Sequence, residues 1–557
     1  KGVTVLFSFI GYKPVEIVIT DQTRIDVPLN EDVTVLKEVA VVTTGYQEVD
    51  ERLFTGSVVT LDGAAIKTEG TPDLSRMLQG RAAGVSVQNV SGTFGAAPKI
   101  RVRGATSITG DNKPLWVIDG VVLEDVVNIS AEQLTTGDPS TLIGSSVAGL
   151  NADDIANITI LKDASATAVY GARAKDGVIV ITTKKGRIGK PLFTYTGKFS
   201  TYLKPTYDNY NIMNSADQMS VYAEMERKGL LNHADVSNQP NGGVYAKMYD
   251  VINRSFDPAS DNFDLGNYNE AKRQFLQRYA QANTDWFDEL FHNSFVQEHS
   301  LGISSGTESS QFYFSTSYYD DQGWSVADNV KRYTANARGN FTLSEKVSFG
   351  LMATGSVRDQ RAPGTVSRET NVVEGSYDRD FDINPFSFAL NTSRVLTAYD
   401  ENNDLEYFTR NYAPFNILNE VNTNYIDLNQ LDLKLQAEFT YKPHKDFKYD
   451  FIGSVRSVNT TTEHKVHEGS NMAEAYRADG SQLIRFGNKF LYFNPDYPNV
   501  DPVVVLPQGG FYNRTDDQMR SYYFKNQLSW NHTFNSIHSA SLVAGQEIRQ
   551  VDRQNSF

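Results

Sequence analysis

One stretch of the sequence has the composition of a nucleotide-binding loop and is the first candidate for chemistry. Residues 158–186 read ITILKDASATAVYGARAKDGVIVITTKKG, in which small residues and glycine separate two apolar runs. Glycines between a strand and a helix can cradle a phosphate. No Gly-Lys-Ser/Thr follows, so the P-loop pattern is not met. The alanines instead favour a short helix packed closely against a sheet, which Gly171 could end in a left-handed conformation.

Other patterns that could support metal binding or catalysis are incomplete. His464 and His467 are three residues apart, as helical metal ligands can be, but they stand in a Thr- and Glu-rich segment. Residues 400–411 (DENNDLEYFTRN) lack the glycine and the final glutamate of a calcium loop. GSSVAG at 144–149 misses the nucleophile-elbow pattern by one residue. We therefore predict no metal site, no cofactor and no enzymatic activity.

The composition excludes several classes of protein. The chain has 52 Lys and Arg against 67 Asp and Glu, a formal net charge of −15, so nucleic acid is not an expected partner. The lack of cysteine excludes disulfides, zinc–thiolate sites, iron–sulfur clusters and thiol catalysis. No run of 18 apolar residues predicts a membrane helix. The 29 Tyr and 31 Phe fit a large soluble β protein or an outer-membrane barrel.

From residue 189 onward, segments of alternating apolar and polar residues recur. In 431–441 the apolar residues occupy every second position, and the same holds for 347–357. This period of two predicts strands, which at roughly 10 to 14 residues are long enough to cross a bilayer at a tilt. The nine predicted strands are 192–203, 297–306, 310–320, 331–343, 347–357, 431–441, 447–457, 521–534 and 538–549.

The connections between these strands are short and long in strict alternation. The short turns are 307–309, 344–345, 442–446 and 535–537, and the longer connections are 204–296, 321–330, 359–430 and 458–520. Outer-membrane barrels have tight periplasmic turns at one rim and long external loops at the other, whereas a β-sandwich has no reason to sort its connections. The sequence therefore predicts a mainly β protein built around a transmembrane antiparallel β-barrel.

Three further regions precede the predicted barrel. Residues 1–34 alternate as three strands near 3–9, 15–19 and 25–29, like the end of a small β-sandwich. The segment LKEVAVVTTGYQ at 36–47 is, from periodicity alone, one more short strand. Residues 47–188 have the size and pattern of an α+β domain. Its predicted elements are a helix at 72–79 and strands at 84–88, 100–103, 116–118, 158–161 and 178–183.

The chain resembles the SusC/RagA-like TonB-dependent transporters of the outer membrane of Bacteroidetes. The segments that carry the resemblance are residues 158–186, PLWVIDGV at 114–121, IRVRG at 100–104 and TDWFDELFHNSFVQEHSLGISSG at 284–306. The sequence KDASAT distinguishes the chain from siderophore receptors. The resemblance covers essentially the whole chain.

The resemblance implies a division into four parts. Residues 1–34 end a carboxypeptidase-regulatory-like β-sandwich extension, 35–46 hold the TonB box and a linker, 47–188 form an internal α+β plug, and 189–557 begin the barrel. Barrels of this kind have 22 strands. Since about nine are present, we expect the chain to be a piece of a longer protein, without the start of that protein and without the second half of the barrel.

The resemblance also implies functional residues. A TonB box pairs with its periplasmic partner as an added strand, through which the partner can pull. We place it at Glu38, Val39, Ala40, Val41 and Val42. The residues of the plug motifs are Arg101, Arg103, Asp119, Gly120, Lys162, Asp163, Tyr170, Gly171 and Arg173. Of these, Lys162, Asp163 and Arg173 either form an ion-pair network in the plug or are solvated.

Aromatic side chains in the predicted external loops are the candidates for ligand contact, because aromatic faces stack on sugar rings and on apolar peptide side chains. These candidates are Trp286, Trp324, Tyr399, Tyr407 and Tyr492. Packing within the loops, or an aromatic girdle at the membrane interface, is the alternative explanation.

The function implied by the resemblance is active import of a large nutrient across the outer membrane. The nutrient is an oligosaccharide or, failing that, an oligopeptide, and the partners are TonB, a SusD-like surface lipoprotein and outer-membrane lipid. The N-terminus is periplasmic, and a dimer of transporter–lipoprotein pairs is one arrangement. Two alternatives remain: an outer-membrane receptor or adhesin without transport, and a soluble all-β carbohydrate-binding or hydrolytic protein, against which the pattern of connections argues.

Overall fold

The structure is a computed structural model and describes most of the 557 residues. The described residues are 3–7, 15–19, 24–25, 27–28, 41–50, 54, 56–67, 71, 73–89, 94, 96, 98–104, 113–127, 129, 139–254, 267–365, 369–371, 376–535 and 538–557. Among these, none of the helices has both the length and the apolar character needed to cross a membrane.

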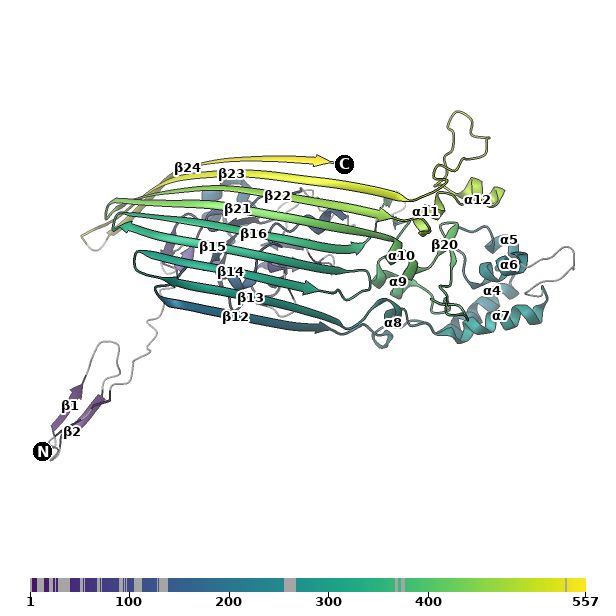
Figure 1. The fold of residues 1–557 in the computed structure, drawn as a ribbon, viewed down its shortest axis with the longest axis horizontal. Coiled ribbons are helices and arrows are strands. Elements are labelled where there is room, and N and C mark those ends of the chain that lie inside the picture. The colour runs from purple at the N-terminus through teal and green to yellow at the C-terminus, as the bar shows by residue number, and fades with distance from the viewer. Residues whose placement is uncertain are drawn as a thin grey trace.

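The largest element is an antiparallel sheet of nine strands that follow one another in chain order (Figure 1). The strands are β12 (Gly189–Tyr202), β13 (Ser294–Gly306), β14 (Ser310–Asp321), β15 (Asn329–Ser344), β16 (Val347–Pro363), β21 (Asn424–His444), β22 (Phe447–Val466), β23 (Phe511–Phe534) and β24 (His538–Ser556). All nine predicted strands are confirmed. The later ones are longer than the alternation indicated: β21 has 21 residues and β23 has 24.

The connections also alternate as predicted. Tight turns at 307–309, 345–346 and 445–446 join strands at one end of the sheet, and long connections carrying most of the helices lie at the other end (Figure 1). The fourth predicted turn, at 535–537, lies mostly outside the described residues.

The two faces of the sheet differ in polarity, as β21 illustrates. Lys434 and Gln436 are 6% and 3% exposed, whereas Leu433 and Leu435 on the opposite face are 49% and 62% exposed. A soluble sheet buries its apolar face, so this arrangement is inverted and is typical of strands that turn an apolar face to lipid.

A smaller α+β unit, the plug, lies against the polar face of the sheet (Figure 1). Its five-stranded sheet has the order β5 (Val58–Asp62), β10 (Ile155–Leu161), β11 (Val178–Thr183), β8 (Leu115–Ile118) and β9 (Val121–Val122). A separate hairpin pairs β6 (Val85–Gln88) with β7 (Lys99–Val102), and the helices are α1 (Leu74–Met77) and α3 (Ala164–Thr167). Leu74, Ile158 and Ile179 are fully buried in its main apolar core.

Two details of the predicted plug are wrong. Arg103 was expected in a strand, but β7 ends at Val102 and Arg103 has a positive φ of 58°. Gly171 was expected to end a helix in a left-handed conformation. The α-helix has already ended at Thr167, and the 3-10 segment that follows, Ala168–Ala174, is kinked at Gly171, whose φ of 64° and ψ of −153° are neither helical nor left-handed helical.

The N-terminal region contributes two short hairpins. β1 (Val3–Phe7) pairs with β2 (Val15–Ile19), and β3 (Val41–Thr43) pairs with β4 (Glu48–Asp50). The prediction of a third strand at 25–29 is wrong where it can be compared, since the described residues 25, 27 and 28 belong to no strand.

The long connections fold into a helical layer beyond the end of the sheet (Figure 1). Its helices are α4 (Ser215–Arg227), α5 (His233–Val236), α6 (Val244–Arg254), α7 (Asn269–Ala282), α8 (Trp286–Leu290), α9 (Pro385–Asn391), α10 (Ile417–Thr423), α11 (Asn471–Ala475) and α12 (Gln482–Gly487). Two small hairpins accompany them, β17 (Glu369–Asn371) with β18 (Ser376–Asp378) and β19 (Phe408–Arg410) with β20 (Ala413–Phe415). We call this set the loop layer. It has apolar cores of its own, such as the one around Phe287 and Trp286.

Candidate functional site: the contact between plug and sheet

A tight turn places one plug motif at the sheet. Asp119 and Gly120 form the two-residue loop between β8 and β9, with φ values of 49° and 78°. Positive φ at both positions defines a type I′ hairpin, which strongly prefers Asp-Gly. A Cβ added at Gly120 would lie 3.1 Å from Ile452 of the nine-stranded sheet and 3.2 Å from the Gly45 carbonyl oxygen, so a larger residue would have to displace these neighbours slightly.

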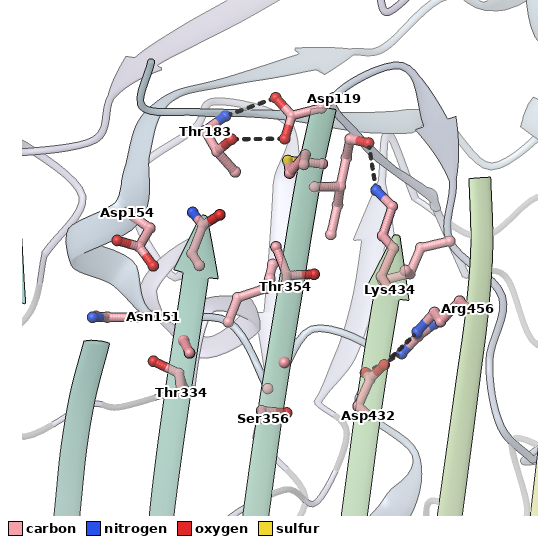
Figure 2. Close-up of a pocket in the computed structure, with 18 of the residues that line it drawn as sticks. Asp119, Asn151, Asp154, Thr183, Thr334, Thr354, Ser356, Asp432, Lys434 and Arg456 are labelled. Atoms are coloured by element: carbon pink, nitrogen blue, oxygen red, sulfur yellow. Dashed lines mark hydrogen bonds and ion pairs between the residues drawn. The ribbon is translucent and has the colours of Figure 1, made fainter. Parts of the chain in front are cut away.

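The Asp119 carboxylate joins the plug to the sheet (Figure 2). It accepts hydrogen bonds from the Thr183 amide at 3.0 Å and from the Thr183 hydroxyl at 2.7 Å, both within the plug. Arg338 of β15 approaches it at 3.2 Å from the sheet. The side chains of Arg338 and Asp119 are 4% and 3% exposed. A buried charge of either sign is costly when its partner is removed.

Backbone groups of the same turn bind further side chains of the sheet (Figure 2). Lys434 donates to the Ile118 carbonyl at 3.3 Å, and Gln436 donates to the Asp119 carbonyl at 2.9 Å. Beside them, Arg456 pairs with Asp432 at 2.7 Å and donates to a plug carbonyl, that of Glu124, at 2.9 Å. Lys434, Asp432 and Arg456 line a cavity of about 50 Å³.

A second group of charges connects the plug to the first strands of the sheet. Asp153 of the plug pairs with Lys67 and, at 3.0 Å, with Lys198 of β12, which also pairs with Glu298 of β13 at 3.0 Å. Burial alone would raise the pKa of Asp153, but its hydrogen bonds and charge interactions with the two lysines outweigh burial and lower the pKa to about 2. Asp153 is therefore ionised under all ordinary conditions.

A third group holds the hairpin β3–β4 between plug and sheet. The Tyr170 hydroxyl donates to the Thr44 carbonyl at 2.6 Å from the plug side. Lys525 of β23 donates to the Gly45 carbonyl at 3.0 Å from the sheet side. Tyr46 donates to Glu547 of β24, which also pairs with Arg173 of the plug at 2.6 Å.

Comparison with known proteins identifies the family. Residues 50–178 match the model of the TonB-dependent Receptor Plug Domain. The chain is 33% identical over 337 residues to the TonB-dependent receptor SusC of Bacteroides thetaiotaomicron, covering 60% of this chain and 27% of that protein. It is 30% identical over 494 residues to the TonB-dependent receptor P26 of Formosa agariphila, covering 85% of this chain and 43% of that protein.

The chain is a SusC/RagA-like member of the TonB-dependent receptor family. A solved structure of the RagAB peptide importer in its "open-open" state shares the fold, with a TM-score of 0.63 and 19% identity over 93% of this chain and 53% of that one. The family resemblance and the fold class expected from the sequence are thus confirmed. The chain spans less than half of the length of these two curated receptors, 27% and 43%.

The predicted plug-motif residues of this receptor lie in different places. Asp119, Gly120, Tyr170 and Arg173 meet the sheet or the hairpin β3–β4, as described above. Arg101 lies on β7 opposite Ser86, and Arg103 donates its amide to the Gly84 carbonyl at 2.7 Å. These contacts describe the positions of the residues, and their functional roles stay predictions.

Of the two alternatives for Lys162, Asp163 and Arg173, the described contacts do not include an ion-pair network among the three. Asp163 caps α3 by accepting from the Ala166 amide at 2.8 Å and also accepts from the Ser57 amide at 2.6 Å. Lys162 donates to the Ala83 carbonyl at 3.2 Å, and Arg173 pairs with Glu547 instead. Asp163 stands directly before α3, a position at which aspartate side chains commonly accept hydrogen bonds from the first amides of the helix.

The predicted TonB box falls only partly on described residues. Glu38, Val39 and Ala40 lie outside them. Val41 and Val42 belong to β3, and Val42 is 1% exposed. The strand expected from periodicity is therefore present at the end of this segment, while the box itself stays a prediction.

The five aromatic candidates for ligand contact are divided between packing and exposure. Trp286 is 3% exposed and donates to the Ser393 carbonyl at 3.2 Å, and Trp324 donates to the Leu203 carbonyl at 2.9 Å. These two pack within the loop layer, which was the alternative explanation. Tyr399, Tyr407 and Tyr492 are 38%, 38% and 52% exposed, and their part in ligand contact stays a prediction.

The residues of the sheet that hold the plug were not among the predicted site residues. Arg338, Lys434 and Lys525 stand at the polar positions of strands that the alternation had already identified. A charge inside an alternating strand that crosses a membrane must face the interior. This signal could have marked them as contacts of the plug.

Proposed function

We propose that the chain takes part in TonB-dependent import of a large nutrient across the bacterial outer membrane. The nutrient is an oligosaccharide or, as the second choice, an oligopeptide. A SusD-like surface lipoprotein binds on the side of the loop layer, TonB acts from the periplasmic side where the N-terminus lies, and the outer face of the sheet contacts lipid. The proposal includes a dimer of two transporter–lipoprotein pairs and requires no catalytic activity.

The observation that carries the proposal is the chemistry of the contact between plug and sheet. The plug has an apolar core of its own, whereas its contact with the sheet combines small apolar clusters, such as Val126 with Val458, with many hydrogen bonds and ion pairs such as Asp119–Arg338. Polar groups can exchange these partners for water with a modest net change in free energy, about 0.5–1.5 kcal/mol for a typical hydrogen bond. A plug of this kind can leave the sheet without losing its own fold.

The hairpin β3–β4 supplies a route for the pull. It includes the last two residues of the predicted TonB box, Val41 and Val42, and is bonded both to the plug, through Tyr170, and to the sheet, through Lys525. We propose that tension on residues 38–42 first breaks the contacts with the sheet and then moves the plug through its bond to Tyr170.

The test uses two substitutions at one position of the predicted box. Val39→Pro removes the backbone N–H that an added strand would donate, whereas Val39→Ala keeps it and removes only side-chain bulk. The nutrient is first identified by growth on single oligosaccharides or oligopeptides as the carbon source. We expect Val39→Pro to abolish this growth with ligand binding intact, and Val39→Ala to have little effect.

A receptor or adhesin without transport predicts a different result. In that case neither substitution would change uptake, because no pull on residues 38–42 would be needed. Equal uptake by both variants and the parent protein, at equal amounts in the outer membrane, would therefore reject the proposed import.

A further inference from the structure

The loop layer contains a cavity of about 500 Å³ that the contact between plug and sheet does not include. This volume lies within the range of about 300–1,000 Å³ of small-molecule sites. Its walls come from segments far apart in the chain, among them the hairpin β19–β20, the helix α9 and the residues that follow it.

One cation on the wall of this cavity has spare binding capacity. Arg410 stacks its guanidinium on the Phe415 ring at 4.7 Å, yet it forms no hydrogen bond or ion pair through its side chain with any residue that the structure describes. Burial lowers the pKa of Arg410, and the charges of Asp382 and Glu420 oppose that effect without contacting it. An arginine remains protonated in proteins, so its donors are available to an anion.

The neighbouring acids do not supply that anion, because each is already bound by other groups. Glu406 accepts from Tyr279 at 2.7 Å and pairs with Lys247 at 2.7 Å and with Arg278 at 3.1 Å. Asp382 accepts from the Ser387 hydroxyl at 3.3 Å and lies 3.6 Å from Arg379. The local geometry thus leaves Arg410 for a ligand.

The rest of the wall is suited to a ligand rich in hydroxyl groups. Polar residues predominate among those that line the cavity. Thr392 and Thr409 line it, and their hydroxyls form no hydrogen bond with a described residue. A peptide side chain of apolar character would leave such groups unsatisfied, whereas the ring hydroxyls of a sugar can pair with them.

We propose that this cavity binds the carboxylate of an acidic oligosaccharide, one that contains uronic acid residues, through the guanidinium of Arg410. The planar guanidinium matches a carboxylate with two parallel hydrogen bonds, and Phe415 holds its plane in place. The inference rests on the proposed import and names the class of its nutrient.

The experiment measures binding to the purified full-length complex in detergent by calorimetry. The probes are trimers of galacturonate and of mannuronate, each compared with its neutral methyl ester. We expect at least one free acid to bind, and Arg410→Gln to weaken it about 10- to 100-fold, since a hydrogen-bonded charge is lost. Binding of the methyl ester should change little in the same variant, and Arg410→Lys should restore part of the affinity.

Arg485→Gln is the matched control, because Arg485 lies in the same loop layer but pairs with Asp501 at 2.8 Å and does not line the cavity. Near-ultraviolet circular dichroism of each variant reports whether the loop layer is folded. Failure of both acids to bind, equal affinity for acid and ester, or an unchanged affinity in a folded Arg410→Gln variant would each overturn the inference. So would binding confined to peptides with a free C-terminal carboxylate.

The result is separable from the test of import. If import depends on Val39 but binding does not depend on Arg410, only the class of the nutrient is wrong. If Arg410 governs binding of an acidic trimer but Val39→Pro leaves uptake unchanged, the cavity stands and the transport proposal fails.

Discussion

The apolar core of the plug and the surface that it turns toward the nine-stranded sheet differ in the forces that hold them together. In the core, Ile158, Ile160 and Ile179 are fully buried among other apolar side chains. At the sheet, Asp119 and Asp153 meet arginine and lysine side chains through directed polar contacts. The core resists water at every point, while the contact, although it includes small apolar clusters such as Ala96 with Leu428, has many polar groups that can accept water as plug and sheet separate. The difference indicates a plug that moves as one body.

Loss of the buried ion pair Asp119–Arg338 is expected to have the largest effect of the changes considered. It should weaken the contact between plug and sheet and leave the core of the plug unchanged. Among the residues that the structure describes, Asp119→Ala leaves Arg338 with only the more exposed Glu438, at 3.3 Å, as an ionic partner. Removing one partner of a buried pair costs up to about 3–5 kcal/mol. Because the chain has no cysteine, a single thiol introduced by Ser356→Cys, at a position 8% exposed, can report separation of plug and sheet. We expect faster labelling of this thiol in Asp119→Ala, with unchanged hydrogen exchange at Ile158.

The control for this prediction is the double variant Asp119→Ala with Arg338→Met. Removal of both partners of a buried pair costs much less than removal of one. If the double variant were labelled as fast as Asp119→Ala, a cause other than the arginine left behind would be responsible.

A cavity in the core is expected to produce the opposite pattern. Ile158 is fully buried, and Ile158→Ala should lower the free energy of unfolding of the plug by about 2–5 kcal/mol. Hydrogen exchange should accelerate in β10 and β11, while labelling of the thiol introduced by Ser356→Cys changes less. Acceleration of both in parallel would show that core and contact open together, contrary to the difference between them.

One buried acid, Glu420, has no cation in contact among the described residues and so contrasts with Asp119, which is paired with Arg338. Glu420 of α10 is 1% exposed and accepts from the Asn471 amide at 2.6 Å, and no described residue pairs with it as a cation. Burial raises the pKa of Glu420 to about 7. The folded state therefore binds this proton more tightly than the unfolded state, so stability falls as pH rises between the two pKa values.

Glu420→Gln should remove that dependence. The variant is expected to be more stable than the parent above pH 7, on the order of 1–3 kcal/mol, and equal to it well below the ordinary pKa of a glutamate. Hydrogen exchange of α10 at pH 5 and pH 8 measures the difference. As a control, Glu401→Gln alters a side chain that is 78% exposed, where little change is expected. If Glu420→Gln stabilised the protein more at pH 5 than at pH 8, the predicted direction of the pH dependence would be contradicted.

The smallest effect is expected where one neutral hydrogen bond is removed. Tyr170→Phe loses the bond to the Thr44 carbonyl, which is worth about 0.5–1.5 kcal/mol. Exchange of the amides in β3 and β4 should accelerate, and the ring should keep its packing against Tyr46, whose centroid lies 4.9 Å away. An effect as large as that of Asp119→Ala would mean that the hairpin, and not the ion pairs, holds the plug.

The sheet could be predicted from sequence because its physics is local. Alternation over 431–441 reflects one face in contact with apolar surroundings and the other with polar ones, and this holds whichever strand is adjacent. The Asp119–Gly120 turn follows from the same kind of local rule, a dipeptide suited to positive φ.

The partners within the site could not be predicted, because they depend on the register of distant strands. Asp119 and Arg338 are separated by 219 positions in the sequence, and Arg173 and Glu547 by 374. The helices of the loop layer were also not predicted, but for a different reason. In α7 the buried residues Ala271, Leu276 and Tyr279 lie on one helical face, so periodicity could have predicted this helix.

Movement of the plug as one body relative to the sheet can be tested with paired cysteines. A Cβ at Gly149 would lie 3.4 Å from the Ser356 Cβ across the contact, close to the spacing of about 3.5–4.5 Å in disulfides. Thr60 and Thr159 face each other inside the plug, with their hydroxyls 3.5 Å apart.

The measurement is uptake of the growth-supporting nutrient by cells carrying either pair, under oxidising and then reducing conditions. We expect that oxidised Gly149→Cys/Ser356→Cys binds ligand but does not import it until reduced, while Thr60→Cys/Thr159→Cys imports in both states. Import through the cross-linked plug and sheet, or a block by the cross-link inside the plug, would show that the plug does not move as one body.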